Sequence, residues 1–154
     1  MCGGYCLIDE NGECTNRIED IAEAVFKGTK PVGDLTYFDE ADAQAMTLMA
    51  SNAGFEVINY QWGSKTSTTY KMLIGVDQPI GELFDLDAIA AYYAAMVPWS
   101  SNSIRKKLDQ IRLTTPAKAL REYDFFNPSS VAEYVTTGML LGYPFESTVH
   151  MIRW

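Results

Sequence analysis

The sequence is poor in the residues from which protein chemistry is usually recognised. It has three cysteines, Cys2, Cys6 and Cys14, crowded at one end, and a single histidine, His150. An odd, clustered set of cysteines is a poor disulfide framework, and it lacks the paired Cys-x-x-Cys spacing typical of a zinc site. No apolar run reaches the ~20 residues that cross a bilayer. We therefore expect a cytoplasmic protein, in a host cytosol, that has no metal, no cofactor and no membrane segment.

Motifs of common enzymes are also missing. The chain has no P-loop, no G-x-G-x-x-G, no G-x-S-x-G and no paired-histidine motif. Asp9, Asn11 and Glu13 alternate as in a calcium-binding loop, but Gly12 falls at the fourth position of such a loop and not at the sixth. These absences favour a protein that is not an enzyme.

What is present is the composition of a globular domain. Of the 154 residues, 47% are hydrophobic and 21% are charged, which excludes wholesale disorder. The pattern predicts an α+β fold with a small, mainly antiparallel sheet of three to four strands and helices packed on it. We expect one domain over residues 1–154, with a mixed α/β part at 1–80 and a mainly helical part at 81–154.

Hydrophobic periodicity places the elements along the chain. Strands are expected at 5–8, 34–38, 55–62 and 68–76, the last two as a hairpin. A helix from about residue 18 is capped by Asn16 and ends at Gly28. A second helix is capped by Asp39, with a buried face formed by Ala43, Met46, Met49, Ala50 and Ala53. Further helices are expected after Asp85 or Asp87, at 104–113, at 131–141 and at 145–152.

The net charge of −8 is spread unevenly, and acidic residues dominate the first third of the chain. The candidate acidic surface comprises Asp9, Glu10, Glu13, Asp39, Glu40 and Asp42. Such carboxylates could imitate the phosphates of a nucleic acid and occupy a basic groove of another protein. They could equally serve solubility, and at helix starts they follow from capping and the helix dipole.

A basic run at 105–107 is the most unusual local feature. Ser101 or Ser103 is expected to cap a helix there, so that Arg105, Lys106 and Lys107 lie in its first turns, where the helix dipole disfavours cations. That cost suggests a phosphate or an acidic protein surface as a partner, including the acidic half of a second copy in a homodimer. Alternatively, the run is a solvated helical face whose apolar residues point inward. Arg112 belongs to the same candidate binding set.

The C-terminal segment SSVAEYVTTGMLLGYPFESTVHMIRW is well patterned. Ser130 and Glu133 have capping-box spacing, and Gly142 stands where a helix end needs a left-handed residue. The LLGYPFEST stretch resembles the endings of small accessory proteins of phages and mobile elements. That resemblance implies that the chain is a short cytosolic inhibitor of a host factor. Anti-CRISPR proteins belong to this class of inhibitor. Tyr143 is the candidate contact residue in this segment.

The opening Met1-Cys2-Gly3 raises the alternative of an enzyme. It resembles class II glutamine amidotransferases and SRAP-type proteins, families in which the cysteine after the initiator methionine is the nucleophile. That resemblance implies catalysis by Cys2, whose own α-amine could act as its base once Met1 is removed. The segments that accompany this cysteine in either family are not found, and a packing role for Cys2 is the simpler interpretation.

Together these features predict a non-enzymatic binding protein that inhibits a host protein. Nucleic-acid-binding effectors are one candidate class of target. The first alternative is a small enzyme that uses Cys2. The second is a nucleic-acid-associated factor that uses the basic patch at 104–121, although the net charge of −8 disfavours duplex DNA.

Overall fold

The computed structural model describes residues 7–8, 11, 13–15 and 17–153. The chain divides into two compact units, residues 1–77 and residues 78–154, which are described one at a time. The last strand ends at Gly75 and the helices of the second unit begin at Ile80, while the expectation of one domain over residues 1–154 stays a prediction.

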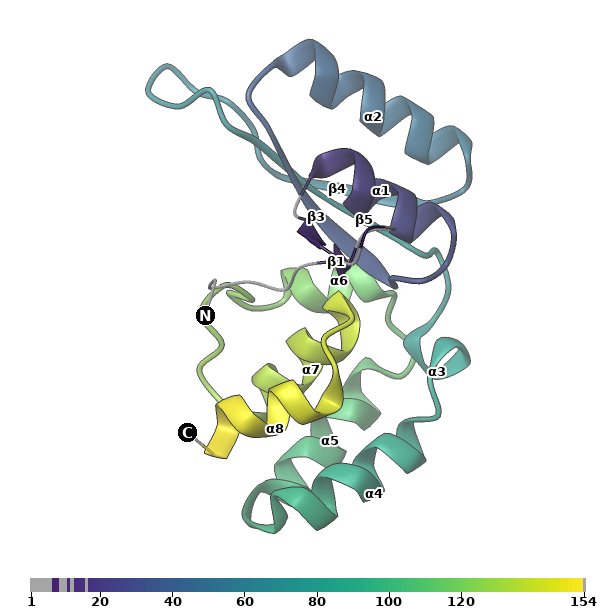
Figure 1. The fold of residues 1–154 in the computed structure, drawn as a ribbon, viewed down its shortest axis with the longest axis vertical. Helices are drawn as coiled ribbons and strands as arrows, with labels where there is room; N and C mark the ends of the chain where they lie inside the picture. Colours follow the sequence, from purple (N-terminus) through teal and green to yellow (C-terminus); the bar gives the residue numbers. More distant parts are fainter. Residues whose placement is uncertain (1–6, 9–10, 12, 16, 154) are drawn as a thin grey trace. The chain divides into compact units, whose positions relative to one another are not determined.

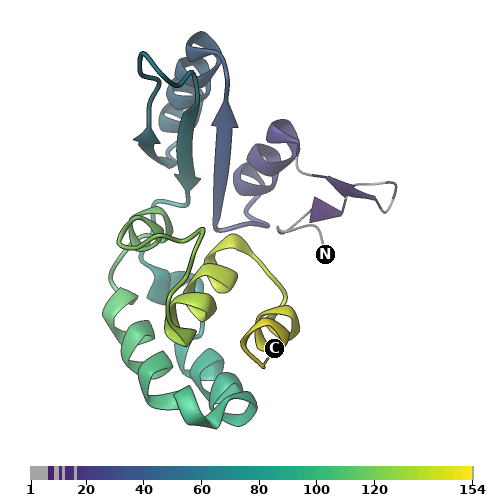
Figure 2. The same cartoon turned by 90° about the vertical axis from the view of Figure 1, so that its left-hand side faces the viewer.

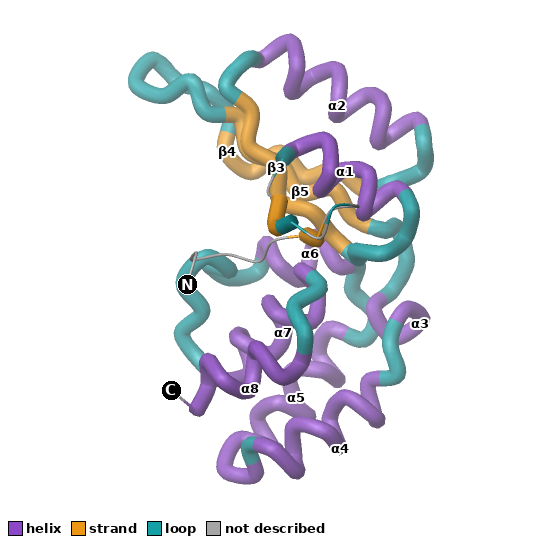
Figure 3. Tube along the Cα trace, in the orientation of Figure 1, coloured by secondary structure: helices purple, strands orange, loops and turns teal. Residues whose placement is uncertain are grey.

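The first unit contains the antiparallel sheet. Its elements are β1 (Leu7–Ile8), β2 (Cys14–Thr15), α1 (Ile18–Phe26), β3 (Val32–Tyr37), α2 (Glu40–Asn52), β4 (Glu56–Gln61) and β5 (Tyr70–Gly75) (Figure 1). β1 and β2 pair with each other, and β5 lies between β3 and β4 in a three-stranded antiparallel sheet. The predicted α+β class is confirmed, and the expected hairpin is the β4–β5 pair. The loop that joins β4 to β5 extends beyond the sheet (Figure 3).

Both helices of this unit cover the same face of the sheet. Side chains alternate along a strand, so Leu35 and its cross-strand partner Met72 point toward α1 and α2. The buried core on this face comprises Ala22, Val25, Leu35, Ala43, Ala50, Met72 and Ile74. A Cβ atom at Gly33 would come within 2.9 Å of Ile21 and 3.0 Å of Val25, so glycine lets α1 approach the sheet closely.

Two local expectations for these helices were wrong. Arg17, not Asn16, occupies the N-cap position of α1, and its side chain makes no capping hydrogen bond. On α2, Met49 and Ala53 are exposed, whereas Ala43 and Ala50 are buried as predicted. Ala43 and Ala50 pack on the sheet together with the partly buried Met46, which leaves Leu48 and Met49 exposed.

The second unit is helical. Its elements are α3 (Ile80–Leu83), α4 (Leu86–Met96), the 3₁₀ turn η1 (Pro98–Ser100), α5 (Ser101–Ile111), α6 (Pro116–Arg121), α7 (Val131–Leu141) and α8 (Phe145–Arg153). α7 contacts α5, α6 and α8 in the helical unit (Figure 2). Most residues of α7 are buried. None of the helices in the described part of the chain is both long and apolar enough to cross a membrane.

The ends of α7 match the sequence pattern. Ser130 Oγ accepts a hydrogen bond from Glu133 N at 3.2 Å, which is the first of the two bonds of the predicted capping box. The Glu133 carboxylate accepts from the Ser130 hydroxyl and not from the Ser130 backbone N–H. Gly142 has φ +86°, the left-handed conformation predicted for this helix end. The chain then turns into α8, whose Phe145 packs its ring against Tyr92 and Tyr93 of α4.

The start of α5 differs from the prediction. Ser101 is the first residue of the helix and continues directly from η1, and no side chain caps it. Ser103 lies inside the helix and donates a hydrogen bond from Oγ to the carbonyl oxygen of Ser100 at 3.0 Å. Arg105 therefore lies more than one turn inside the helix, where the dipole effect on a cation is small.

Candidate protein-binding surface

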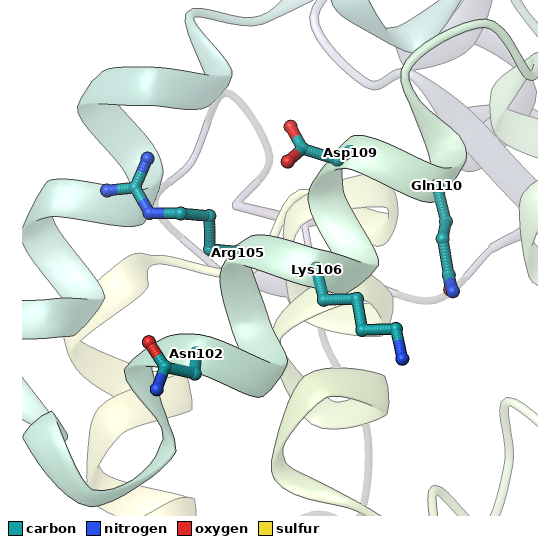
Figure 4. A pocket seen from close by; sticks show the side chains of 5 residues that line it. All are labelled: Asn102, Arg105, Lys106, Asp109 and Gln110. Carbon is teal, nitrogen blue, oxygen red and sulfur yellow. The ribbon is translucent and has the colours of Figure 1, made fainter.

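One face of α5 displays polar and charged side chains. Asn102, Arg105, Lys106, Asp109 and Gln110 recur every three or four residues, so they share one side of the helix, and all are exposed (Figure 4). This surface, the α5 outer face, is lined by one helix, so it is an open face and not an enclosed cavity. The opposite side carries Ile104, Leu108 and Ile111, which are buried.

Two of the four predicted basic residues are engaged within the second unit. Lys107 Nζ lies 3.9 Å from a carboxylate oxygen of Glu122 and 5.4 Å from the centre of the Tyr123 ring, and only 19% of its side chain is exposed. Arg112 Nη2 lies 3.2 Å from Asp109 and 3.8 Å from Asp87. The α5 outer face therefore offers Arg105 and Lys106 to a partner.

Tyr143 is half-buried and follows the left-handed Gly142 at the end of α7. Its backbone N–H donates to the Gly138 carbonyl oxygen at 2.7 Å, which closes the helix end. A partner-binding role for the Tyr143 side chain stays a prediction.

Three of the predicted acidic residues lie together at the start of α2. Asp39 Oδ1 accepts hydrogen bonds from Ala41 N at 2.8 Å and Asp42 N at 3.2 Å, which makes Asp39 the N-cap predicted from the sequence. Asp39, Glu40 and Asp42 are all exposed. Of the remaining acidic candidates, Glu13 is exposed before β2, while Asp9 and Glu10 lie outside the described residues.

Large apolar side chains are exposed beside these carboxylates. Phe38 is 75% exposed, Leu48 64% and Met49 51%. The small residues Ala41 and Ala45 are exposed between them along the same side of α2. We call this surface, formed by Phe38, Asp39, Glu40, Ala41, Asp42, Ala45, Leu48 and Met49, the α2 outer face.

Sequence reasoning missed this apolar surface because it looked for one buried face on α2. The signal was present, since Ala41, Ala45 and Leu48 follow the same i, i+4, i+7 spacing as a core face. They lie on the side opposite the buried Ala43 and Ala50. A helix that is apolar on two sides and covered on one exposes the other.

The charge of the chain belongs almost wholly to the first unit. Residues 1–77 contain twelve acidic and five basic residues, a net charge of −7, whereas residues 78–154 contain eight and seven, a net charge of −1. No lysine or arginine occurs between Lys30 and Lys65, a stretch that includes all of α2. The α2 outer face is therefore locally anionic as well as apolar.

A second group of ionisable residues gathers around the sheet. Asp34 on β3 alternates with the core residues Gly33 and Leu35, and Tyr60 Oη donates a hydrogen bond to Asp34 Oδ1. Burial raises the pKa of Asp34, while Tyr60, Lys71 and Lys30 oppose that rise. Burial also lowers the pKa of Lys30 to about 8, despite attraction from Asp34. Mutual contacts satisfy these charges, so a structural role accounts for them.

Cys2 and Cys6 lie outside the described residues. Within the described ranges, no three His, Cys, Asp or Glu residues are grouped closely enough to hold a metal ion. Comparison with protein-family models, curated proteins and solved structures finds no match to this chain, so its surfaces are interpreted from their own geometry.

Proposed function

We propose that the chain is a non-enzymatic binding protein that occupies and blocks a host protein in the cytosol, as inhibitors encoded by phages and mobile elements do. The binding surface is the α2 outer face. The observation that carries this proposal is the exposure of Phe38, Leu48 and Met49, with three carboxylates, along α2 and the residues just before it. Exposed apolar side chains gathered in one place are typical of interaction sites.

The apolar residues supply the affinity in this proposal. Full burial of one side chain of the size of leucine, phenylalanine or methionine stabilises by about 1.5–3 kcal/mol. Leu48, at 64% exposed, and Phe38, at 75%, retain most of that contribution for a partner. Ala41 and Ala45 between them let a partner's backbone or side chains approach α2 closely.

The carboxylates determine which partner fits. Asp39, Glu40 and Asp42 lie at the N-terminal end of the apolar stripe, and α2 has no basic residue to offset them. A partner surface of complementary chemistry presents lysines or arginines beside an apolar patch. Complementary charge speeds association, and like charge disfavours binding to acidic surfaces. We therefore expect the host protein to have a basic surface. Nucleic-acid-binding proteins belong to that class.

A photo-crosslinking residue at position 48 tests the surface directly. The variant Leu48→p-benzoyl-phenylalanine is produced in the source or host cells, and its adducts are compared with those of the same substitution at Phe126. Phe126 is the control because it is also a large exposed apolar residue, at 54%, but lies in the second unit. We expect a discrete adduct with one basic protein from position 48 and none of that mass from position 126.

Charge variants then connect the adduct to the proposed chemistry. Glu40→Gln/Asp42→Asn in the crosslinking background should reduce the adduct, while Glu19→Gln/Glu23→Gln on α1 removes the same charge and should leave it unchanged. An adduct from position 126 alone, or one from position 48 that survives loss of the carboxylates, would assign the binding surface elsewhere. Adducts that nuclease removes would favour the nucleic-acid alternative.

A further inference from the structure

The α5 outer face complements the α2 outer face in charge and in the placement of its apolar residues. Arg105 and Lys106 are exposed near the middle of α5, and Trp99 and Leu113 are exposed before and after them. We propose that two copies of this chain associate by docking the α5 outer face of one copy on the α2 outer face of the other. The occupant of the apolar side of α2 is then a second copy.

The spacing of charge and apolar groups supports this pairing. Glu40 precedes Leu48 by eight residues, and Arg105 precedes Leu113 by the same number. Arg112 keeps helical dihedral angles, so the α5 spiral continues toward Leu113. Eight helical residues span about 12 Å in both cases. Two parallel helices can therefore place Arg105 beside Glu40 and Leu113 beside Leu48 at once.

Lys106 extends the match. With Arg105 beside Glu40, the same register places Lys106 level with Ala41. The four-carbon stem of Lys106 can cover Ala41 and Ala45 while its ammonium group reaches Asp42. The small alanines leave room for that stem.

Asp109 is the one acidic side chain on the α5 outer face, and its charge is compensated. Arg112 Nη2 donates a hydrogen bond to Asp109 Oδ1 at 3.2 Å. Lys107 is turned toward Glu122, so it does not add to this surface. The net character of the α5 outer face is cationic, opposite to that of the first unit with its charge of −7.

This association concerns the same α2 surface that the proposed function uses, but it does not depend on that function. If both hold, a second copy hides the surface until a host protein displaces it. If the chain captures no host protein, self-association remains measurable, because it requires only the purified chain.

Sedimentation velocity of the full chain tests the proposal. We expect the mean mass to rise above that of a monomer between about 10 μM and about 1 mM protein. The association should weaken when salt is raised from about 0.05 M to about 1 M, because ions screen the opposed charges. A chain that is monomeric throughout, or whose association is unaffected by salt, would contradict the docking of these two faces.

Charge reversal identifies the faces. Glu40→Lys/Asp42→Lys and Arg105→Glu/Lys106→Glu should each raise the dissociation constant more than ~10-fold. A mixture of the two variants should associate again, because the lysines of one then face the glutamates of the other. Controls with equal charge changes, Glu19→Lys/Glu23→Lys and Lys118→Glu/Arg121→Glu, should keep association within ~3-fold of the unmodified chain. Circular dichroism checks that each variant is folded.

The mixture of the two charge-reversal variants gives the decisive result. A mixture that stays monomeric while each variant is folded would show that the two faces do not meet. Equal weakening by the controls would show that only total charge matters, and that result also rejects the pairing. The self-association experiment uses only the purified chain and no host protein. If self-association fails, the proposed function is still tested by the photo-crosslinking experiment.

Discussion

The contact between α7 and α8 allows a sharp test of packing. Gly138 lies in the middle of α7, and a Cβ atom built there would overlap Thr148 Oγ1 of α8 while staying 3.5 Å from Thr148 Cβ. Thr148 is 2% exposed, so its side chain has little room to move. Gly138→Ala is thus expected to overpack the junction, which costs about 1–3 kcal/mol. The higher helix propensity of alanine offsets about 1 kcal/mol of that cost.

A second substitution should reverse this effect. Thr148 Oγ1 is buried, and within the described part neither it nor the nearby Tyr93 Oη makes a well-formed hydrogen bond. Thr148→Ala removes the overlapping oxygen and loses one methyl group, a cost of about 0.8 kcal/mol. The double variant Gly138→Ala/Thr148→Ala should therefore be near the stability of the unmodified chain. We expect a coupling free energy of about 1–2 kcal/mol between the two sites.

Urea unfolding followed by circular dichroism gives the free energy of unfolding of the unmodified chain, of the two single variants and of the double variant. The four values can be compared if the slope of this free energy against urea concentration is the same in all of them. Thr148→Val is the matched control, because its extra methyl group occupies the place of Oγ1 and should preserve the overlap. Gly138→Ala/Thr148→Val should remain destabilised. Additive effects in the alanine cycle, or equal rescue by valine, would refute the steric explanation.

The other predictions concern a helix end, the basic helix and a buried lysine. Gly142→Val should lower the free energy of unfolding by more than ~1 kcal/mol, because valine resists positive φ, and Gly142→Asn should cost less. Lys107→Glu should destabilise by about 1 kcal/mol through loss of its ion pair and ring contact, whereas Arg105→Glu/Lys106→Glu should leave the melting temperature nearly unchanged. Burial lowers the pKa of Lys30 to about 8 from its ordinary 10.5, so the unfolded chain binds more protons between these values. The free energy of unfolding should therefore rise from pH 8 toward pH 10, and urea titrations of Lys30→Met should lack that rise.

Features that depend on neighbouring residues were predictable from the sequence. The periodic apolar residues of α1 and the capping box of α7 lie within a few positions of one another, so their pattern reports directly on local geometry. Gly28 and Gly142 both have positive φ, as expected for glycines that end helices. The inward positions of α5, Ile104 among them, follow from the same spacing.

Features that depend on distant residues were not predictable in this way. The hairpin pattern indicated that β4 pairs with β5, but nothing local specifies that β3 pairs with β5 rather than with β4. Lys107 looked equivalent to Lys106 in the sequence, and only the fold brings Glu122 and Tyr123 beside it. The candidate basic set was therefore larger in the sequence than the surface that the fold presents.

The same reasoning explains why total charge is a poor guide to what this chain binds. At physiological salt, charges on the surface are screened beyond about 8 Å, so an approaching partner senses one helix face and not the net charge of −8. At the start of α2 that local field is anionic and lies beside exposed apolar side chains, while on α5 it is cationic through Arg105 and Lys106. A basic host protein and a second copy of the chain would therefore compete for α2. Raising the concentration of the chain should then lower the fraction available to the host protein.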